Sequence, residues 1–263
     1  MAAKDSVRYT VGFAAAVCVV CALLVASASV ALQPRQDANA RLYMQKNVLL
    51  AAGLADPGAD LTEAELRRIF DERIVVRLVD FATGQLVPAE RIDAAGYDQR
   101  RARNDPAASR AAPANRAGIS RMANYGLVYF VKGPGGVEQI VIAVEGLGMW
   151  GTIYGFVALA PDANTVLGLT FYDQKETPGL GGEIGNPTWQ ALWRGRKGYD
   201  ERWEPRITVI KGNAGPPEQD PLRVDGLSGA TITSNAVTRL MQFWLSDDGY
   251  GRWLTRLREG AGT

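Results

Sequence analysis

A hydroxyl-rich turn, Asp-Gly-Leu-Ser-Gly-Ala-Thr-Ile-Thr-Ser at residues 225–234, is the densest group of residues in this chain that could do chemistry. Apolar residues at spacings of three and four follow it over 235–245, which predicts an amphipathic helix directly after the turn. Unpaired backbone N–H groups at the start of a helix attract phosphate, and Thr231 or Thr233 could be esterified by one. The same residues could instead simply cap the helix, since Ser, Thr and Asp are expected at that position of any helix.

A second dense group is the loop Glu-Thr-Pro-Gly-Leu-Gly-Gly-Glu at residues 176–183. Its glycines allow positive φ and let the backbone approach a flat ligand closely, although a glycine-rich turn without a ligand has the same composition. Glu176 and Glu183 are candidates for a general base, but a lone carboxylate beside glycines is more often a solvated loop charge or a hydrogen-bond acceptor. Trp150 could flank an aromatic ligand, whereas its residue type alone predicts a place in the core.

The composition excludes several classes of function. The chain has 263 residues, a net charge of +1 and no histidine. Without histidine, Ser-His-Asp and Cys-His catalysis and most catalytic zinc sites are ruled out, so we expect neither a catalytic side chain nor a metal site. No basic stripe interleaved with aromatic residues is present, which argues against nucleic acid as a partner. Reactivity would have to come from a cofactor that the protein positions.

The N-terminal part of the chain carries a membrane signal. Residues 10–32 contain no charged side chain, and as a helix they would be about 34 Å long, enough to cross a hydrocarbon core. A cleaved signal peptide is the alternative, because Lys4 and Arg8 precede the run and Ala-Ser-Ala at 26–28 resembles a cleavage site. The length of the run favours a retained transmembrane helix in the lipid bilayer. Basic residues lie on both sides of it, so the positive-inside rule leaves the orientation nearly open.

Both cysteines lie within this apolar run. Cys18 and Cys21 are three residues apart and would share one helical face. An iron–sulfur cluster would need further thiolates from another chain, and packing in lipid or against a partner helix is the more usual role of such residues. The remainder of the chain therefore has neither a disulfide framework nor a cysteine-based metal site.

The region after the apolar run is predicted to be helical at first. Polar residues 33–36 should end the membrane helix, and a second helix is expected over 37–52. Thr62 and Glu65 have the spacing of a capping box, which predicts the start of a further helix. A strand should follow directly, at residues 74–79.

Residues 93–123 show no sustained period, so we expect a mobile connection whose arginines form a solvated face. After residue 123 the pattern predicts strands and short helices. The strands are expected at 127–131, 137–144, 153–159, 166–171 and 206–210. The helices are expected at 187–193 and 250–257. Because the helical segments are too few to connect parallel strands throughout, we expect an α+β fold with a largely antiparallel sheet flanked by helices, after one N-terminal transmembrane helix. The predicted organisation is a membrane anchor at 1–35, a connecting region at 36–123 and a ligand-binding domain at 124–263.

The two loops together resemble a known pair of motifs. Ser-Gly-Ala-Thr at 228–231 is similar to the flavinylation motif of proteins that carry FMN on a threonine through a phosphoester bond, attached by a dedicated flavin transferase. Preceded by Glu-Thr-Pro-Gly-Leu-Gly at 176–181, it resembles the FMN-bearing subunits of two membrane complexes. These are the C subunit of the sodium-translocating NADH:quinone reductase and the G subunit of the Rnf complex. Four further segments favour the quinone reductase family and extend the resemblance over nearly the whole chain: 32–39, 47–54, 148–155 and 182–189.

Two features depart from that family. Relatives often carry a histidine just before Glu-Thr-Pro-Gly-Leu-Gly, where this chain has Tyr-Asp-Gln-Lys at 172–175. A protonatable imidazole therefore cannot be essential beside the flavin here. The Ala- and Arg-rich stretch 102–118 matches nothing in the family. Neither departure touches the attachment motif.

The resemblance implies an extracytoplasmic FMN-binding domain with the cofactor bound covalently to Thr231. Trp150 and the remaining residues of the two loops are then candidates to bind the cofactor, namely Ser228, Gly229, Ala230, Thr233, Glu176, Thr177, Gly179, Leu180 and Gly181. Backbone N–H groups of the glycine loop could donate to the isoalloxazine ring and adjust its potential. Within the turn we expect Thr233 and Ser234 to cap the helix and Asp225 to serve recognition by the transferase.

The resemblance further implies a single-pass protein of the bacterial inner membrane whose soluble domain lies on the periplasmic side. It would relay electrons from a membrane iron–sulfur centre to the flavins of the B subunit, in a six-subunit complex whose other members are designated A, B, D, E and F. That complex oxidises NADH, reduces ubiquinone and exports Na⁺. The chain alone should be inactive, because no Gly-x-Gly-x-x-Gly follows a predicted strand. Two alternatives stay open: the Rnf G subunit, which passes electrons between NADH and ferredoxin, and a membrane-anchored binding module without a redox role.

Overall fold

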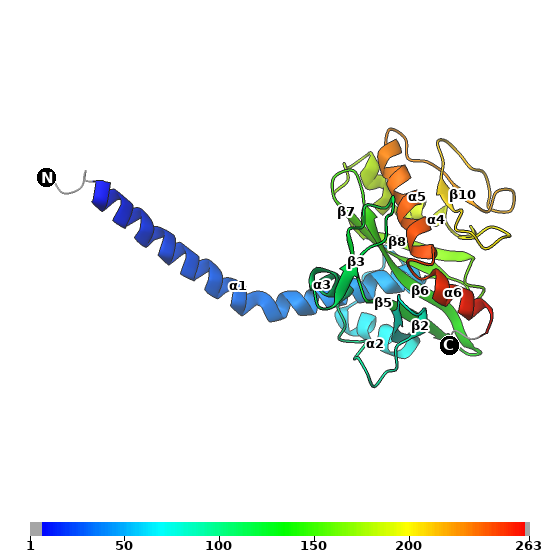
Figure 1. Cartoon of the computed structure of the whole chain (residues 1–263), viewed down its shortest axis with the longest axis horizontal. Coiled ribbons are helices and arrows are strands. Elements are labelled where there is room, and N and C mark those ends of the chain that lie inside the picture. The colour runs from blue at the N-terminus through cyan, green and yellow to red at the C-terminus, as the bar shows by residue number, and fades with distance from the viewer. Residues whose placement is uncertain (1–6, 261–263) are drawn as a thin grey trace. The chain divides into compact units, whose positions relative to one another are not determined.

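The computed structural model describes residues 7–260, which fall into two compact units divided between Met44 and Gln45. The N-terminal unit consists of the first part of helix α1 (Val7–Ala51), which is long and apolar enough to cross a membrane (Figure 1). The apolar N-terminal helix predicted from the sequence is thus confirmed. The expected break at 33–36 is wrong, because α1 continues through Pro34 to Ala51. A proline removes a single backbone donor and costs about 3 kcal/mol, a penalty that long helical segments on both sides can absorb.

The larger unit is built on one antiparallel sheet, as the sequence predicted. Six strands follow the order β2-β1-β5-β6-β7-β8, and every neighbouring pair is antiparallel. Their bounds are β1 (Ile74–Asp80), β2 (Gln85–Leu86), β5 (Tyr125–Gly133), β6 (Gly136–Leu147), β7 (Thr152–Leu159) and β8 (Val166–Asp173). The hairpin expected between β5 and β6 turns at Gly133 and Gly136, which pair with each other.

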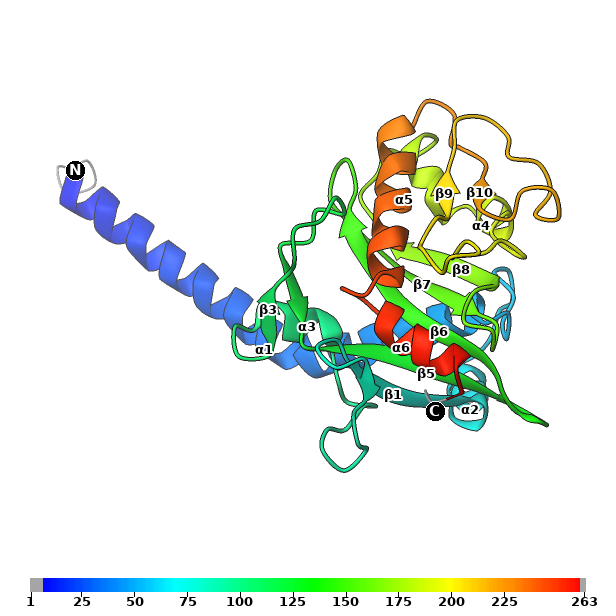
Figure 2. The same ribbon diagram turned by 45° about the vertical axis from the view of Figure 1, so that its right-hand side comes forward.

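Both faces of the sheet are covered by helices. Side chains of β5 alternate between the two faces, so their contacts show what covers each one. Val128 and Phe130 belong to the core shared with helix α5 (Thr231–Leu245). Tyr129, between them, packs edge-on against Phe70 of helix α2 (Glu63–Arg73). Figure 2 shows α5 and helix α6 (Gly251–Arg258) lying across one face, with α2 on the other.

Helix α5 lies directly on β6, and a glycine makes this possible. A Cβ on Gly146 would come within 2.5 Å of the Leu240 Cβ, closer than carbon atoms can pack. The apolar stripe of α5 then enters the core, and the Trp244 indole N–H donates to the Glu145 carbonyl at 2.6 Å. The sheet therefore fixes the position of the C-terminal half of α5.

The region between β2 and β5 departs from the expected mobile connection. It contains helix α3 (Gln99–Asn104) and the paired strands β3 (Ser109–Ala111) and β4 (Arg121–Ala123). Its arginines do not form a purely solvated face, since Arg100 and Arg103 are ion-paired to Asp173 and Glu145 of the sheet. These partners lie 73 and 42 residues away in the sequence, so no local pattern could reveal them.

Residues 36–123, which were expected to form a connecting region, contribute strands to the sheet itself. All seven residues of β1 pair with β5, and the compact unit begins at Gln45. Within this unit the Thr170 hydroxyl of β8 donates to the Asn47 carbonyl at 3.3 Å. The last turn of α1 is thus packed against the sheet that carries the loops described below.

Two helix starts predicted from local sequence motifs were confirmed. Thr62 and Glu65 form the predicted capping box of α2, and Asn186 caps helix α4 (Pro187–Ala191) by accepting from Thr188 N–H at 2.9 Å. The strand predicted at 206–210 is reduced to β9 (Thr208–Val209), which pairs in parallel with β10 (Arg223–Val224). A short 3₁₀ helix, η1 (Gly181–Gly185), precedes α4.

Candidate functional site

Thr231 is the first residue of α5 and its side chain faces solvent. The N-cap position is Ala230, which has no side-chain acceptor, and its carbonyl accepts from Ser234 N–H at 3.0 Å. Since the first N–H groups of a helix have no intrahelical partner, those of the first turn are available to an anion. An esterifiable hydroxyl and free donors thus coincide at one helix end.

The expectation that Thr233 and Ser234 cap this helix is wrong. The helix begins earlier than predicted, so both residues lie inside its first turns and are buried. The Ser234 hydroxyl accepts from Leu227 N–H at 3.3 Å, which holds the preceding turn against the helix. The Thr233 hydroxyl donates to the Glu176 carboxylate instead of to its own helix.

Glu176 joins three segments of the chain. Its side chain is 4% exposed, and Oε1 accepts from Met149 N–H at 2.9 Å and from Trp150 N–H at 3.0 Å. The other carboxylate oxygen accepts from Thr233. A buried carboxylate requires such charge-assisted bonds to offset its lost hydration. Of the roles considered for this residue, the hydrogen-bond acceptor is confirmed and the solvated loop charge is wrong.

Gly181 of the glycine loop and Gly148 of the turn after β6 both pack closely against Glu176. A Cβ on Gly181 would lie well inside van der Waals contact with the Thr233 hydroxyl and 3.0 Å from the Glu176 Cβ. A Cβ on Gly148 would lie 2.6 Å from the Glu176 carboxylate. Gly179 and Gly229 are needed for another reason, because their φ values of 75° and 70° favour glycine.

Five exposed apolar side chains lie at the end of β6, in the turn after it, in the glycine loop and next to Thr231. We call them the apolar rim, and they are Leu147, Met149, Trp150, Leu180 and Ile232. Trp150 is 62% exposed, so the core position expected from its residue type is wrong. Leu180 lies close to the turn at residues 225–234, because its Cδ2 atom is 3.0 Å from where a Cβ on Gly229 would lie. Clustered exposed apolar side chains mark surfaces that bind a ligand or a partner.

The structure brings most of the predicted site residues together, and these residues have different structural roles. Glu176, Gly181 and Thr233 form the packed centre, while the Thr177 carbonyl closes the loop by accepting from Leu180 and Gly182 N–H groups. Ser228 and Gly229 are exposed on the approach to α5, and Ala230 is its buried N-cap.

Sequence reasoning missed three residues of this site, Leu147, Met149 and Ile232. Met149 contributes a backbone donor, and Ile232 contributes an exposed side chain beside the attachment position. The adjacent motif residues Trp150 and Thr231 were the only signals that could have indicated them. Asp225 accepts from Ala214 N–H at 2.9 Å, and its expected role in recognition stays a prediction.

A polar cluster anchors the ends of β6, β7 and β8, next to the turn at residues 148–151 and the glycine loop. Arg103 donates to Glu145 at 2.9 Å and to the Tyr154 hydroxyl at 3.0 Å, and Arg100 lies 3.4 Å from the centre of the Tyr154 ring. Burial raises the pKa of Glu145, and the Arg103 guanidinium opposes this shift only in part. The Arg100 ion pair with Asp173, at 2.9 Å, fixes the end of β8 just before Glu176.

The described residues contain no group of three or more histidine, cysteine, aspartate or glutamate side chains that could hold a metal ion. Cys18 and Cys21 are both exposed on α1 and unlinked.

Comparison with known proteins agrees with this geometry. The FMN-binding domain family matches residues 148–246, which include both loops and α5. The C subunit of the Na⁺-translocating NADH-quinone reductase of Vibrio vulnificus (strain YJ016) is 44% identical over 262 residues, covering 99% of each chain. The corresponding protein of Pseudomonas aeruginosa PAO1 is 43% identical over 263 residues, again covering 99% of each.

Solved structures give the same result. NqrC of Shewanella oneidensis superposes with a TM-score of 0.76 at 32% identity, covering 84% of this chain and 99% of that one. The C subunit of the Parabacteroides distasonis reductase gives a TM-score of 0.64 at 26% identity, covering 85% and 97%. On the full-length identity, the shared fold and the matched FMN-binding domain, the chain belongs to the C-subunit family of the Na⁺-translocating NADH-quinone reductase.

Proposed function

We propose that this subunit carries FMN as a phosphoester on Thr231 and relays electrons within its complex, from a membrane iron–sulfur centre to the flavins of the B subunit. This relay is part of the electron flow from NADH to ubiquinone that drives Na⁺ export. When bound, FMN would supply the electron-transfer chemistry. The chain's own residues attach, orient and surround it.

The observation that carries the proposal is the position of the Thr231 hydroxyl. It is exposed at the first residue of α5, where the N-cap offers no competing side-chain acceptor. A phosphoester there would meet unpaired N–H donors and the positive end of the helix dipole. The Thr231 hydroxyl oxygen would attack the flavin-bearing phosphorus of a flavin dinucleotide presented by the transferase, the bond from that phosphorus to the departing nucleoside monophosphate would break, and the hydroxyl proton would pass to solvent.

The surrounding residues are suited to hold an aromatic ring near that phosphate. Glu176 accepts three hydrogen bonds from the protein. It therefore holds the glycine loop, the turn at Met149 and Trp150, and the first turn of α5 in place relative to one another. The apolar rim supplies side chains that a flat ring system can contact, Trp150 among them. Peptide N–H groups of the glycine loop are the groups that could adjust the ring's potential.

The proposed setting is the periplasmic side of a bacterial inner membrane, with α1 as the anchor and a flavin transferase as the maturation enzyme. Covalent attachment suits that compartment, because a flavin lost there would not be replaced from a free pool. The partners would be the A, B, D, E and F subunits. The chain lacks a nicotinamide-binding motif, so NADH oxidation would belong to another subunit.

Intact mass and in-gel fluorescence test the attachment. Co-expressed with the transferase, the wild-type chain should gain the mass of one FMN-phosphoryl unit and fluoresce after denaturing electrophoresis, whereas Thr231→Ala should do neither. Thr188→Ala removes an exposed hydroxyl outside both loops and should be labelled like wild type. Loss of label in Thr233→Ala alone would move the attachment by two residues, and an unlabelled, colourless wild type would favour a binding module without a redox role.

A further inference from the structure

A groove of about 400 Å³ runs along the outer face of α5. Its walls come from the helix and from the turn between β3 and β4, and its lining residues are Asn115, Arg116, Asn235, Thr238, Arg239, Gln242 and Phe243. Successive residues at three and four places share a helical face, so Asn235, Thr238 and Gln242 continue the stripe that starts at Thr231. The groove therefore begins one helical turn from the proposed attachment position.

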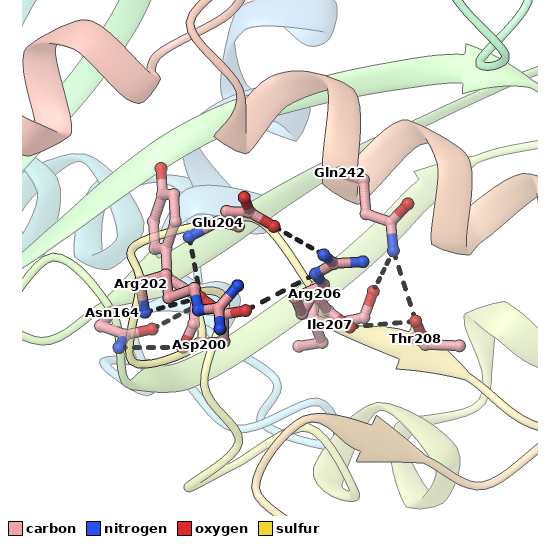
Figure 3. Close-up of polar contacts among 9 residues, drawn as sticks. Asn164, Asp200, Arg202, Glu204, Arg206, Ile207, Thr208 and Gln242 are labelled. Carbon is pink, nitrogen blue, oxygen red and sulfur yellow. Dashed lines mark hydrogen bonds and ion pairs between the residues drawn. The ribbon is translucent and has the colours of Figure 1, made fainter.

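The walls of the groove are held by hydrogen bonds within the protein. The Asn115 side chain donates to the Pro113 and Ile119 carbonyls at 2.8 Å and accepts from Ile119 N–H at 3.1 Å, which fixes the turn that presents Arg116. On the other wall the Gln242 amide donates to the Ile207 carbonyl at 3.1 Å and to the Thr208 hydroxyl at 3.3 Å, as Figure 3 shows. The shape of the groove is thus built into the fold.

The charge of the groove is uncompensated. Arg116 and Arg239 are both exposed, and within residues 7–260 neither forms an ion pair. No carboxylate lines the groove. The acidic side chains near its Gln242 end, Asp200 and Glu204, are already paired with Arg206 at 3.5 and 2.6 Å (Figure 3).

The groove is continuous with the apolar rim. Leu147 N–H donates to the Ala117 carbonyl at 2.7 Å, so the residue after Arg116 is hydrogen-bonded to a rim residue. On the helix, Ile232 of the rim lies one turn before Asn235 of the groove. An apolar patch bordered by unpaired cations is typical of a surface that a protein partner covers.

We infer that this groove docks an acidic segment of another subunit of the complex. Arg116 and Arg239 would pair with its carboxylates, while Asn and Gln side chains and the Phe243 floor complete the contact. Complementary charge at such a surface accelerates encounter and fixes the register of docking. This inference rests on the proposed function, because a carrier of electrons must present its cofactor face to its partners.

Photo-crosslinking in the purified complex tests the inference. The full-length chain would carry Asn235→p-benzoylphenylalanine, and the crosslinked peptide would be identified by mass spectrometry. We expect a segment of another subunit rich in Asp and Glu. Adding Arg116→Glu and Arg239→Glu, or raising the ionic strength, should lower the crosslink yield by about tenfold. Arg68→Glu reverses an exposed charge on α2, on the opposite face of the sheet, and should leave the yield unchanged.

The absence of a crosslink to another subunit, or a yield that the double charge reversal does not lower, would overturn the inference. Melting temperatures of the variants should match wild type, since both arginines are exposed. Covalent flavin content, measured on the same samples, separates the two proposals. A crosslink without covalent flavin refutes only the attachment, and covalent flavin without a crosslink refutes only the docking groove.

Discussion

Gly181→Ala tests whether the glycine loop is packed against α5 as the structure has it. The φ of Gly181 is not in the left-handed region, so alanine suffers no backbone strain there. Its new methyl group would, however, overlap the Thr233 hydroxyl and press on the Glu176 Cβ at 3.0 Å. Overpacking of this kind costs about 1–3 kcal/mol, which lowers the melting temperature of a domain of this size by roughly 2–4 °C per kcal/mol.

Gly185→Ala is the matched control. It lies in the same 3₁₀ helix, also without a positive φ, and its Cβ would meet nothing closer than the Phe171 carbonyl at 3.9 Å. Alanine at that position should therefore leave the unfolding free energy unchanged or slightly increased, since it restricts the unfolded chain.

A double-mutant cycle isolates the contact itself. Thr233→Ala alone removes a hydrogen bond to a buried carboxylate and should cost about 1.5–3 kcal/mol. In the double variant the hydroxyl that the new methyl would strike is gone, so the combined loss should be smaller than the sum of the two by about 1–2 kcal/mol. Denaturant titrations of the full chain in detergent would measure each value. Strict additivity, or a Gly181→Ala no worse than Gly185→Ala, would refute the packing argument.

Three further predictions concern other parts of the molecule. Because burial raises the pKa of Glu145 above 4.5, the folded state holds this proton more tightly than the unfolded chain. Its contribution to stability is therefore present at low pH and lost as the pH rises, and Glu145→Gln should remove this slope in denaturant titrations between about pH 4 and pH 8. Trp150→Ala should change the melting temperature little, since the side chain is 62% exposed, but it should alter the fluorescence of the bound flavin. Unchanged fluorescence would show that Trp150 does not contact the flavin ring. Thr62→Ala removes the α2 capping box and should cost about 1 kcal/mol in unfolding titrations, whereas no loss would mean that the cap is not formed in solution.

Prediction from the sequence succeeded where neighbouring residues decide the structure. The capping box of Thr62 and Glu65 and the Asn186–Pro187 helix start depend on contacts within one turn, so their spacing was sufficient. The β5–β6 hairpin likewise follows from the glycines at its turn. For the same reason the α+β class and its antiparallel sheet were predictable from the alternation of strand runs and turns.

Prediction failed where distant segments meet. Nothing in the pattern around Trp150 distinguishes an exposed tryptophan from a core one, because its burial depends on which elements lie above it. The arginines of α3 looked solvated for the same reason, since their partners are on the sheet. The start of α5 was misplaced because Thr233 and Ser234 have hydrogen-bond partners outside their own helix.

The sequence by itself determined the residues that matter chemically: a threonine after Ser-Gly-Ala, a glycine loop ending a strand, and an apolar run long enough for a membrane. These are properties of residue type and short spacing. Only the tertiary structure decided that Glu176 is buried and bonds to Thr233, 57 residues away, and to the backbone of a third segment. A buried carboxylate is stable only when donors from separate parts of the chain converge on it, and the folding of the sheet brings those donors together.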